Sequence, residues 1–333
     1  MIDDLDLDEY EHYAERFEPR ETGRRRKPGK QRSQSQVVAE LAEPTGLEAG
    51  FVTTYQPARY EKEWLLSSLR TFYDEHLITD VLAQVKGGKE ASVYRCAAEP
   101  STGAAMLAAK VYRPRQFRNL RNDKVYREGR AILTADGRPV KKTDHRIMRA
   151  VGKKTAFGAQ VQHTSWIMYE YTTMERLHQA GAAVPSVVAP AENAILMGYC
   201  GDERRAAPTL NEIGLVRKEA GALFQEVLRN IELMLQHNLI HGDLSAYNIL
   251  YWEGRVVIID FPQVTDLRTN GQADLILHRD IRRVCEYFAK QGVPCDPNAI
   301  MTQLWDQYGR DLAAEQQEYI EPDLSTDDTD YAD

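Results

Sequence analysis

Apolar residues recur at steps of three and four along residues 60–76, which predicts a helix with one hydrophobic face. That face carries Trp64, Leu65, Leu69, Phe72 and Tyr73. Short apolar runs follow at residues 81–85, 91–96 and 106–112, and turn residues stand between them. Runs of this kind predict neighbouring strands joined by tight turns. The first half of the chain is therefore expected to be rich in strands.

Helical spacing dominates the second half. A helix is predicted over residues 166–180, and Gly181 stands where a left-handed residue ends a helix. Further elements are predicted as short strands at 187–188, 194–199 and 255–259, and as helices near 223–235, 278–290 and 300–308. Glu253 and Gly254 form the turn of a hairpin. We expect an α+β fold with two lobes and a cleft between them.

Charge divides the chain further. The net charge is −8, yet residues 111–165 hold 14 Lys and Arg against 4 Asp and Glu, and residues 311–333 hold 9 acidic residues and no basic one. We expect a disordered N-terminal tail at 1–50 and an acidic C-terminal tail at 311–333. Between them we expect an N-lobe at 51–198, with a basic flexible insertion at 113–162, and a C-lobe at 199–310.

The composition favours a cytoplasmic protein without a membrane partner. The apolar stretches are far too short to span a bilayer, and the N-terminus is acidic rather than a secretory signal. The four cysteines are scattered and form no CxxC pair, as expected for reduced thiols. The basic runs at 20–32 and 113–162 are either solvated segments or contacts to a polyanion such as RNA or nucleotide phosphate.

The strongest chemical signal is the run 241–250, HGDLSAYNIL, followed by the apolar strand that ends at Asp260. Phosphoryl transfer needs a carboxylate that orients the attacking hydroxyl and oxygen ligands that hold Mg²⁺. Asp243 fits the first role, and Asn248 and Asp260 fit the second. This D-x-x-x-x-N pattern with a following Asp is typical of the kinase catalytic and metal residues.

Lys110 lies in an apolar strand about twenty residues after a glycine turn, which is where kinases place the lysine that binds α- and β-phosphates. We expect Glu170 to hold it. Glu175 is the rival, but it lies off the apolar helix face. The turn itself is not a GxGxxG or Walker loop. Gly87 and Gly88 still permit close approach to phosphates, and Lys89 and Ser92 supply donors.

These motifs resemble the RIO family of atypical serine/threonine protein kinases. Four segments match in order: GKEASVY at 88–94, AKVY at 109–112, Glu170 with RLHQAG at 176–181 and VP at 184–185, and the 241–250 run with IDFPQ at 259–263. The resemblance covers about residues 77–290.

The resemblance implies an abbreviated two-lobed protein-kinase-like fold, with an antiparallel sheet plus helix in the N-lobe and a mainly helical C-lobe. It implies ATP and Mg as cofactors and a protein Ser/Thr substrate. It also implies ATPase activity with a phospho-aspartate at Asp260, and suggests a ribosomal particle as a partner. The residues implied around the nucleotide, besides those of the glycine turn, are Val93, Ala108, Met197, Tyr199, Cys200, Ile249 and Ile259.

Two other functions remain open from the residues. Small-molecule phosphotransferases of the aminoglycoside or choline kinase type share HGDxxxxN and the following ID. A nucleotide-gated assembly factor with slow ATP hydrolysis would also use the intact Lys, Asp, Asn and Asp set.

Overall fold

The computed structural model describes residues 51, 53–113, 130–141, 143–153 and 155–309. The chain divides into one unit at 1–45 and a second at 46–333, and all described residues belong to the second. The two expected tails and most of the first half of the expected insertion lie outside the described residues.

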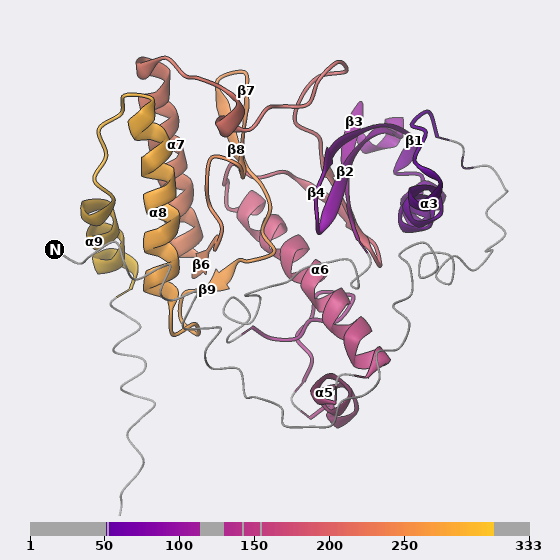
Figure 1. Cartoon of the computed structure of the whole chain (residues 1–333). Coiled ribbons are helices and arrows are strands. Elements are labelled where there is room, and N and C mark those ends of the chain that lie inside the picture. The colour runs from indigo at the N-terminus through magenta and orange to yellow at the C-terminus, as the bar shows by residue number, and fades with distance from the viewer. Residues whose placement is uncertain (1–50, 52, 114–129, 142, 154, 310–333) are drawn as a thin grey trace, which may run out of the picture. The chain divides into compact units, whose positions relative to one another are not determined.

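An antiparallel sheet with a leading helix forms the first part of the described chain (Figure 1). The strands pair in the order β1-β2-β3-β5-β4. The elements are α3 (Arg59–Asp74), β1 (Ile78–Gly87), β2 (Ala91–Ala98), the 3₁₀ turn η1 (Pro100–Thr102), β3 (Met106–Tyr112), β4 (Val187–Pro190) and β5 (Ala194–Gly198). Each predicted strand and the leading helix are confirmed.

The two faces of β3 belong to different cores. Leu107, Ala109 and Val111 pack with Leu65, Leu69 and Phe72 of α3. The intervening residues point to the other face, where Ala108 and Tyr112 pack with residues of α6. Lys110 lies on the same strand face as Ala108 and Tyr112. Its side chain therefore points away from α3 and toward α6.

Helices α5 (His145–Gly152) and α6 (Ala156–Gln179) occupy residues that we expected in a flexible insertion. Asp144 accepts from the Ile147 N–H, and Thr155 accepts from the Gly158 N–H, so both helices begin with a side-chain cap. The helix predicted at 166–180 is the second part of α6, whereas α5 and the start of α6 were not predicted: α5 buries no residue fully, and the first two turns of α6 bury only Gly158. At the other end, Gly181 has φ +81°, which confirms the predicted left-handed stop.

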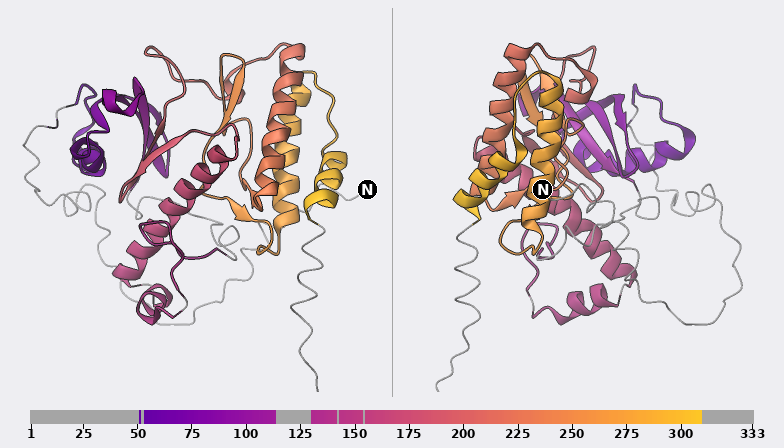
Figure 2. Two further views of the ribbon diagram at one scale, coloured as in Figure 1. Left: turned by 180° about the vertical axis from the view of Figure 1, so that it is seen from behind. Right: turned by 60° about the vertical axis from the view of Figure 1, so that its left-hand side comes forward.

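The rest of the described chain is mainly helical, as expected. It contains η3 (Leu210–Glu212), α7 (Arg217–Gln236), β6 (Leu239–Ile240), β7 (Ile249–Trp252), β8 (Arg255–Ile258), β9 (Thr265–Asp266), α8 (Ala273–Lys290) and α9 (Pro297–Tyr308). Helices α7 and α8 lie side by side in the views of Figures 1 and 2. Strands β7 and β8 form the predicted hairpin, and its turn residues Glu253 and Gly254 both have positive φ.

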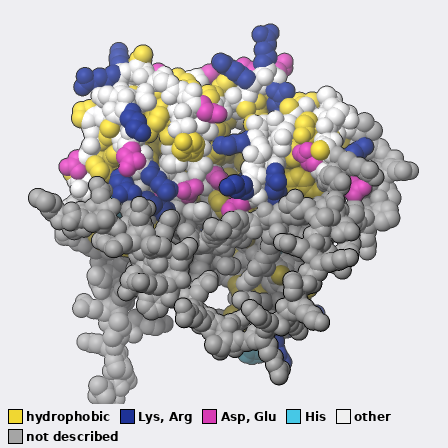
Figure 3. Space-filling view, in the orientation of Figure 1, with side chains coloured by type: hydrophobic (Ala, Val, Ile, Leu, Met, Phe, Trp, Pro, Cys, Tyr) yellow, Lys and Arg dark blue, Asp and Glu magenta, His cyan; other side chains and the backbone are white. Residues whose placement is uncertain are grey.

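The described surface mixes both signs of charge. On the face drawn in Figure 3, Lys and Arg side chains are interspersed with Asp and Glu, and hydrophobic side chains lie between them. Within the described parts of the chain, no helix has the length and apolar character that crossing a membrane requires.

We expect the α3 core to depend on Phe72, whose side chain is fully buried between the helix and the sheet. Phe72→Ala removes most of that contact area and should lower the free energy of unfolding by about 3–5 kcal/mol. Urea denaturation measures the change. Leu275→Ala, at a position that is 57% exposed, is the control and should change stability little. Equal effects of the two substitutions would contradict the assigned packing.

Candidate active site

Three segments that lie far apart in the sequence meet at one ammonium group. Lys110 Nζ on β3 lies 2.5 Å from Glu170 Oε1 on α6 and 2.6 Å from Asp260 Oδ1, just after β8. Glu170 is only 1% exposed, so a charge partner is needed to offset its loss of hydration. The expected lysine, its helix carboxylate and the strand-end aspartate are therefore brought together.

The Glu170 carboxylate has further partners. Its Oε2 accepts from the Tyr112 hydroxyl at 2.6 Å, and its Oε1 also accepts from the Phe261 N–H at 3.3 Å. Sequence reasoning missed Tyr112, although it lies two residues after Lys110 and therefore on the same strand face. The Phe261 contact attaches the segment after Asp260 directly to α6.

The charges of the pair reinforce each other. Burial acts to lower the pKa of Lys110, but the carboxylates of Asp260 and Glu170 outweigh it and raise that pKa. Burial acts to raise the pKa of Asp260, but Lys110 outweighs it and lowers that pKa. Lys110 is therefore a cation and Asp260 an anion throughout the neutral pH range.

Asp260 retains an open side. Its side chain is 42% exposed, and its Oδ2 accepts no hydrogen bond from the described residues. Its φ of +73° lies in the left-handed region, which non-glycine residues rarely adopt. Such a conformation is maintained at a cost of about 1–3 kcal/mol when the surroundings fix it. Here it turns the chain sharply at the end of the hairpin, beside Lys110.

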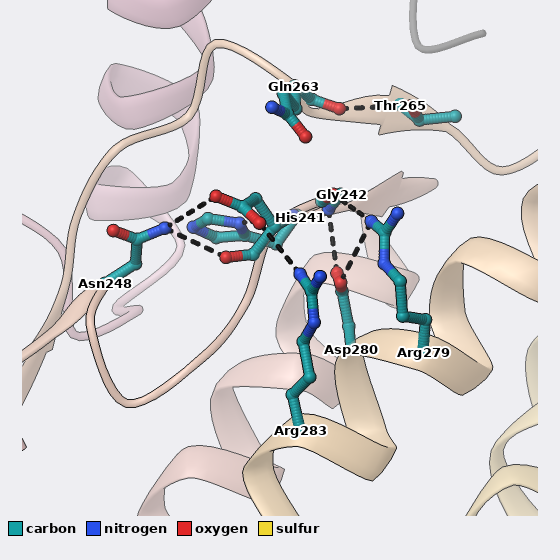
Figure 4. Close-up of polar contacts among 9 residues, drawn as sticks. His241, Gly242, Asn248, Gln263, Thr265, Arg279, Asp280 and Arg283 are labelled. Atoms are coloured by element: carbon teal, nitrogen blue, oxygen red, sulfur yellow. Dashed lines mark hydrogen bonds and ion pairs between the residues drawn. The ribbon is translucent and has the colours of Figure 1, made fainter. Parts of the chain in front are cut away.

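Asn248 links residues 241–250, which we call the catalytic loop, to the same region. Its Nδ2 donates to the Asp243 carbonyl at 2.9 Å and to Asp243 Oδ2 at 3.1 Å. Because both partners are acceptors, the amide nitrogen must face them, and the amide oxygen points the other way (Figure 4). The Ile259 N–H also donates to the Asn248 carbonyl at 2.9 Å, which places Asn248 beside the residue before Asp260.

The donor set suits Mg²⁺. Asn248 Oδ1 and Asp260 Oδ2 accept no hydrogen bond from the described residues, and oxygen is the ligand type that this ion prefers. No cluster of three or more His, Cys, Asp or Glu side chains able to hold a metal is present in the described parts of the chain. A Mg²⁺ ion at this place would therefore be held by Asn248 and Asp260 together with groups from outside the protein, as in phosphoryl-transfer sites.

Helix α8 hydrogen-bonds to the backbone of the catalytic loop. Asp280 Oδ2 accepts from the Gly242 N–H at 2.8 Å, and Arg279 donates to the Gly242 carbonyl (Figure 4). Gly242 has φ +83°, and a Cβ there would collide with the Gln263 carbonyl, so glycine is required. Burial raises the pKa of Asp280 to about 7. One local signal could have identified Asp280, because it falls on the apolar stripe of its helix.

The side chain of Asp243 is also paired from α8. Arg283 Nη1 lies 2.8 Å from Asp243 Oδ1, and both side chains are about two-fifths exposed. Asp243 Oδ2 already accepts from Asn248, so both carboxylate oxygens have a donor. Sequence reasoning did not identify Arg283, because nothing local relates it to a residue forty positions earlier.

The glycine turn is built as expected in part. The Gly88 N–H donates to the Ala91 carbonyl, and a Cβ on Gly88 would lie 2.6 Å from that oxygen. Gly87 and Lys89 are exposed at this turn. Ser92 is different: it pairs with Val111 on the α3 face and is 1% exposed, so its side chain does not join Lys110.

A cross-strand row leads from this turn to Lys110. Lys86 pairs with Val93, and Val93 pairs with Lys110, so the three side chains share one face of the sheet. Lys86 contributes to lowering the pKa of Asp260, which places a second positive charge near that carboxylate. Alternation along the hairpin identifies Lys86, which our sequence reasoning passed over.

The residues expected around an adenine ring lie on that face in part. Ala108 pairs with Met197, and both are nearly buried beside Lys110. Ile249 is 1% exposed and packs in the core, whereas Ile259 is half-buried. Leu250 pairs with Val257 and therefore shares the face of Ile259. Leu250 is thus the better neighbour for a ligand.

The segment after β5 is already hydrogen-bonded within the chain. The Gly198 N–H donates to the Ser186 carbonyl, and the Cys200 carbonyl accepts from the Ala207 N–H. The Tyr199 hydroxyl donates to the Asp202 carbonyl at 3.3 Å. The Gly198 N–H and the Cys200 carbonyl are therefore engaged within the chain.

The basic stretch before α5 reaches this site. Arg130 donates to the carbonyls of Pro262, at 3.0 Å, and Val264. Its guanidinium also lies over the Tyr169 ring, 4.7 Å from the ring centroid. The end of the expected insertion is thus attached to the segment that follows Asp260.

Comparison with known proteins gives a matching family and several relatives. A family model described as the RIO domain matches residues 92–300. The chain is 29% identical over 230 residues to the RIO-type serine/threonine-protein kinase Rio1 of Haloferax volcanii, covering 68% of this chain and 69% of that protein. It is 28% identical over 231 residues to the serine/threonine-protein kinase RIO1 of Chaetomium thermophilum, covering 66% of this chain.

The extent of these matches differs between relatives. The aligned part spans 41% of the C. thermophilum protein. The RIO-type serine/threonine-protein kinase Rio1 of Thermoplasma acidophilum is 30% identical over 135 residues, which cover 40% of this chain and 69% of that protein.

We expect His241 to make folding sensitive to mild acid. Its Nε2 lies 3.1 Å from the Ile259 carbonyl, and its Nδ1 accepts from the Asp243 N–H at 3.2 Å. Because an imidazole nitrogen that accepts a hydrogen bond carries no proton, His241 is neutral in the folded protein. Burial lowers its pKa from 6.5. The unfolded chain therefore takes up the proton first, and stability is lost as the pH falls below about 6.5.

His241→Phe tests this expectation because it keeps a ring beside Phe261 and removes the titration. The stability advantage of the wild type over this variant should shrink by up to about 1.4 kcal/mol per pH unit between pH 6.5 and 5. Urea denaturation at each pH measures the difference. An advantage that stays constant or grows on acidification would show that His241 is charged in the folded protein.

Proposed function

The chain belongs to the RIO family, and on that basis we propose that it is an ATP-dependent serine/threonine protein kinase that also hydrolyses ATP with Mg²⁺. The observation that carries the proposal is the contact of Lys110 with both Glu170 and Asp260. A lysine held by a helix carboxylate and aimed at a metal-binding aspartate is the arrangement that phosphoryl transfer from ATP requires.

The nucleotide side of the site follows from the sheet face. Lys110 binds the α- and β-phosphates, and Glu170 keeps its ammonium in place. Gly87, Gly88 and Lys89 cover the phosphates, with Lys86 beside them. The apolar side chains of Val93, Ala108 and Met197 from the sheet, and of Ile259 and Leu250 from the hairpin, surround the adenine.

The acceptor side follows from the catalytic loop. Asp243 orients the hydroxyl and takes its proton, because its side chain is 41% exposed and an acceptor can reach it. Asn248 and Asp260 hold Mg²⁺ through the oxygens that face away from their protein partners. A metal ion held by these two residues would supply positive charge that neutralises the phosphates. Most of the rate enhancement then comes from positioning and charge stabilisation.

The acceptor itself is a serine or threonine hydroxyl of another protein, with Asp260 or water as the acceptor in the ATPase reaction. A cytoplasmic location and a ribosomal or RNA partner belong to this proposal. The basic residues Arg146, Arg149 and Lys153 on or next to α5 support a polyanion contact, since the helix buries none of its side chains.

A single-turnover assay with γ-labelled ATP tests the proposal. We expect label on a protein Ser or Thr, or transiently on Asp260 before release to water. Acid-stable label reports the hydroxyl ester, and hydroxylamine-labile label reports the acyl phosphate. Label transferred only to a sugar, aminoglycoside or choline would instead show a small-molecule phosphotransferase. Release to water alone, coupled to binding of a partner, would show a nucleotide-gated assembly factor.

We expect Asp243 and Asp260 to fail in different ways. Asp243→Asn removes the proton acceptor and should lower turnover by about 10²–10⁴-fold with ATP affinity nearly unchanged. Asp260→Asn removes a metal ligand and should abolish the Mg²⁺ dependence of ATP binding. Asp274→Asn, at an exposed position early in α8, is the matched control. Collapse of ATP affinity in Asp243→Asn with turnover preserved would reverse the assigned roles.

A further inference from the structure

The catalytic loop carries no positive charge of its own. Residues 241–252 contain no Lys or Arg. Phosphoryl transfer spreads negative charge over the oxygens of the transferred group, and fixed cations at that position lower the barrier. Lys110 is engaged with Glu170 and Asp260 on the nucleotide side. The side from which the hydroxyl attacks therefore needs a cation from another part of the chain.

Arg283 supplies a cation at that position. It extends from α8 toward the catalytic loop (Figure 4), and its Nη1 lies 2.8 Å from Asp243 Oδ1. The carboxylate that orients the hydroxyl is thus in direct contact with a guanidinium. The neighbouring pair of Arg279 and Asp280 faces the Gly242 backbone instead.

The exposure of the pair argues against a purely structural role. The side chains of Arg283 and Asp243 are 39% and 41% exposed, and half-exposed ion pairs add only about 0–1 kcal/mol to stability. The loop backbone is already held by Arg279 and Asp280 through Gly242. Removing Arg283 therefore leaves the anchoring of the loop in place.

Most N–H groups of Arg283 contact no acceptor among the described residues. A guanidinium has five N–H groups in a planar fork that fits phosphate oxygens in pairs. Within the described residues, Asp243 is the acceptor that Arg283 contacts. Asn248 occupies the other oxygen of Asp243, with its own amide oxygen free for the metal. Arg283 and Asn248 thus stand on opposite sides of the carboxylate.

We propose that Arg283 is a catalytic residue that binds the γ-phosphoryl oxygens of a nucleoside triphosphate during transfer, which rests on the proposed function. The hydroxyl oxygen forms its bond to the γ-phosphorus while the bond from that phosphorus to the β-phosphate oxygen breaks. The hydroxyl proton passes to Asp243, and ADP leaves with the electron pair. Arg283 stabilises the phosphoryl oxygens throughout and orients Asp243 from the same position.

Three variants test this role. Arg283→Gln removes the charge, Arg283→Lys keeps the charge without the fork, and Arg282→Gln is the control on the adjacent position, where the arginine pairs only loosely with Glu286 at 3.6 Å. The measurements are turnover of ATP, the dissociation constant of MgADP, and the gain in ADP affinity when aluminium fluoride, a mimic of the transferred phosphoryl group, is added.

We expect Arg283→Gln to lower turnover by about 10²–10³-fold, the loss seen when one fixed donor to a transition-state oxygen is removed. Its MgADP affinity should equal that of the wild type, and the gain from aluminium fluoride should be lost. Arg283→Lys should recover part of both, and it also provides the test if Arg283→Gln does not fold. Arg282→Gln should behave as the wild type.

Two results would overturn the proposal while leaving the proposed function intact. One is wild-type turnover in Arg283→Gln. The other is reduced turnover with the full aluminium fluoride gain, which would make Arg283 a residue that only positions Asp243. A wild-type protein that neither binds MgADP nor turns over ATP would overturn the proposed function, and this proposal with it.

Discussion

The contact between Lys110 and two carboxylates is the constraint on which the site depends. Glu170 is almost completely buried, and a carboxylate in such a place is stable only with a cation and further donors around it. Lys110, Tyr112 and the Phe261 N–H supply these. Because the partners come from β3, α6 and the segment after β8, satisfying one buried charge fixes the sheet, the long helix and the turn at Asp260 against each other.

A second constraint comes from helix α8. It hydrogen-bonds to both the N–H and the carbonyl of Gly242, and its Arg283 pairs with the Asp243 side chain. The catalytic loop has little regular structure of its own, so its conformation depends on these contacts and on the Asn248 amide. The two constraints meet at Ile259, whose carbonyl contacts His241 and whose N–H bonds Asn248. The segment at Asp260 and the 241–250 loop are thereby held at fixed positions relative to each other.

Much of this arrangement was visible in the sequence because its signals are local. Strand alternation put Lys110 on the opposite face from Leu107, Ala109 and Val111, and the helical period put Glu170, not Glu175, on the buried face. The same alternation places Ser92 on the α3 face and pairs Leu250 with the face of Ile259, and our expectations for those positions did not apply it. Those two differences were predictable.

Other features were not predictable from local patterns. Helix α5 is only eight residues long and buries no residue fully, so its short apolar pattern did not stand out from the surrounding basic stretch, and it begins at the Asp144 cap. Arg279 and Arg283 are charged residues of the kind that usually lie on a solvated helix face, and Asp280 lies between them on the buried face. Their function depends on how α8 is rotated against a loop about forty residues earlier, and only the folded chain determines that rotation.

The decisive measurement is a double-mutant cycle with Lys110→Met, Glu170→Gln and the variant that carries both. Calorimetry measures the MgADP affinity of each protein. Losing a hydrogen-bonded charge at a phosphate should weaken binding by about 10–100-fold in Lys110→Met. Since Glu170 acts through Lys110, adding Glu170→Gln should cost little more, and the variant with both changes leaves no unpaired buried charge. Wild-type affinity in Lys110→Met, or effects of the two substitutions that simply add, would contradict a nucleotide site organised by this ion pair.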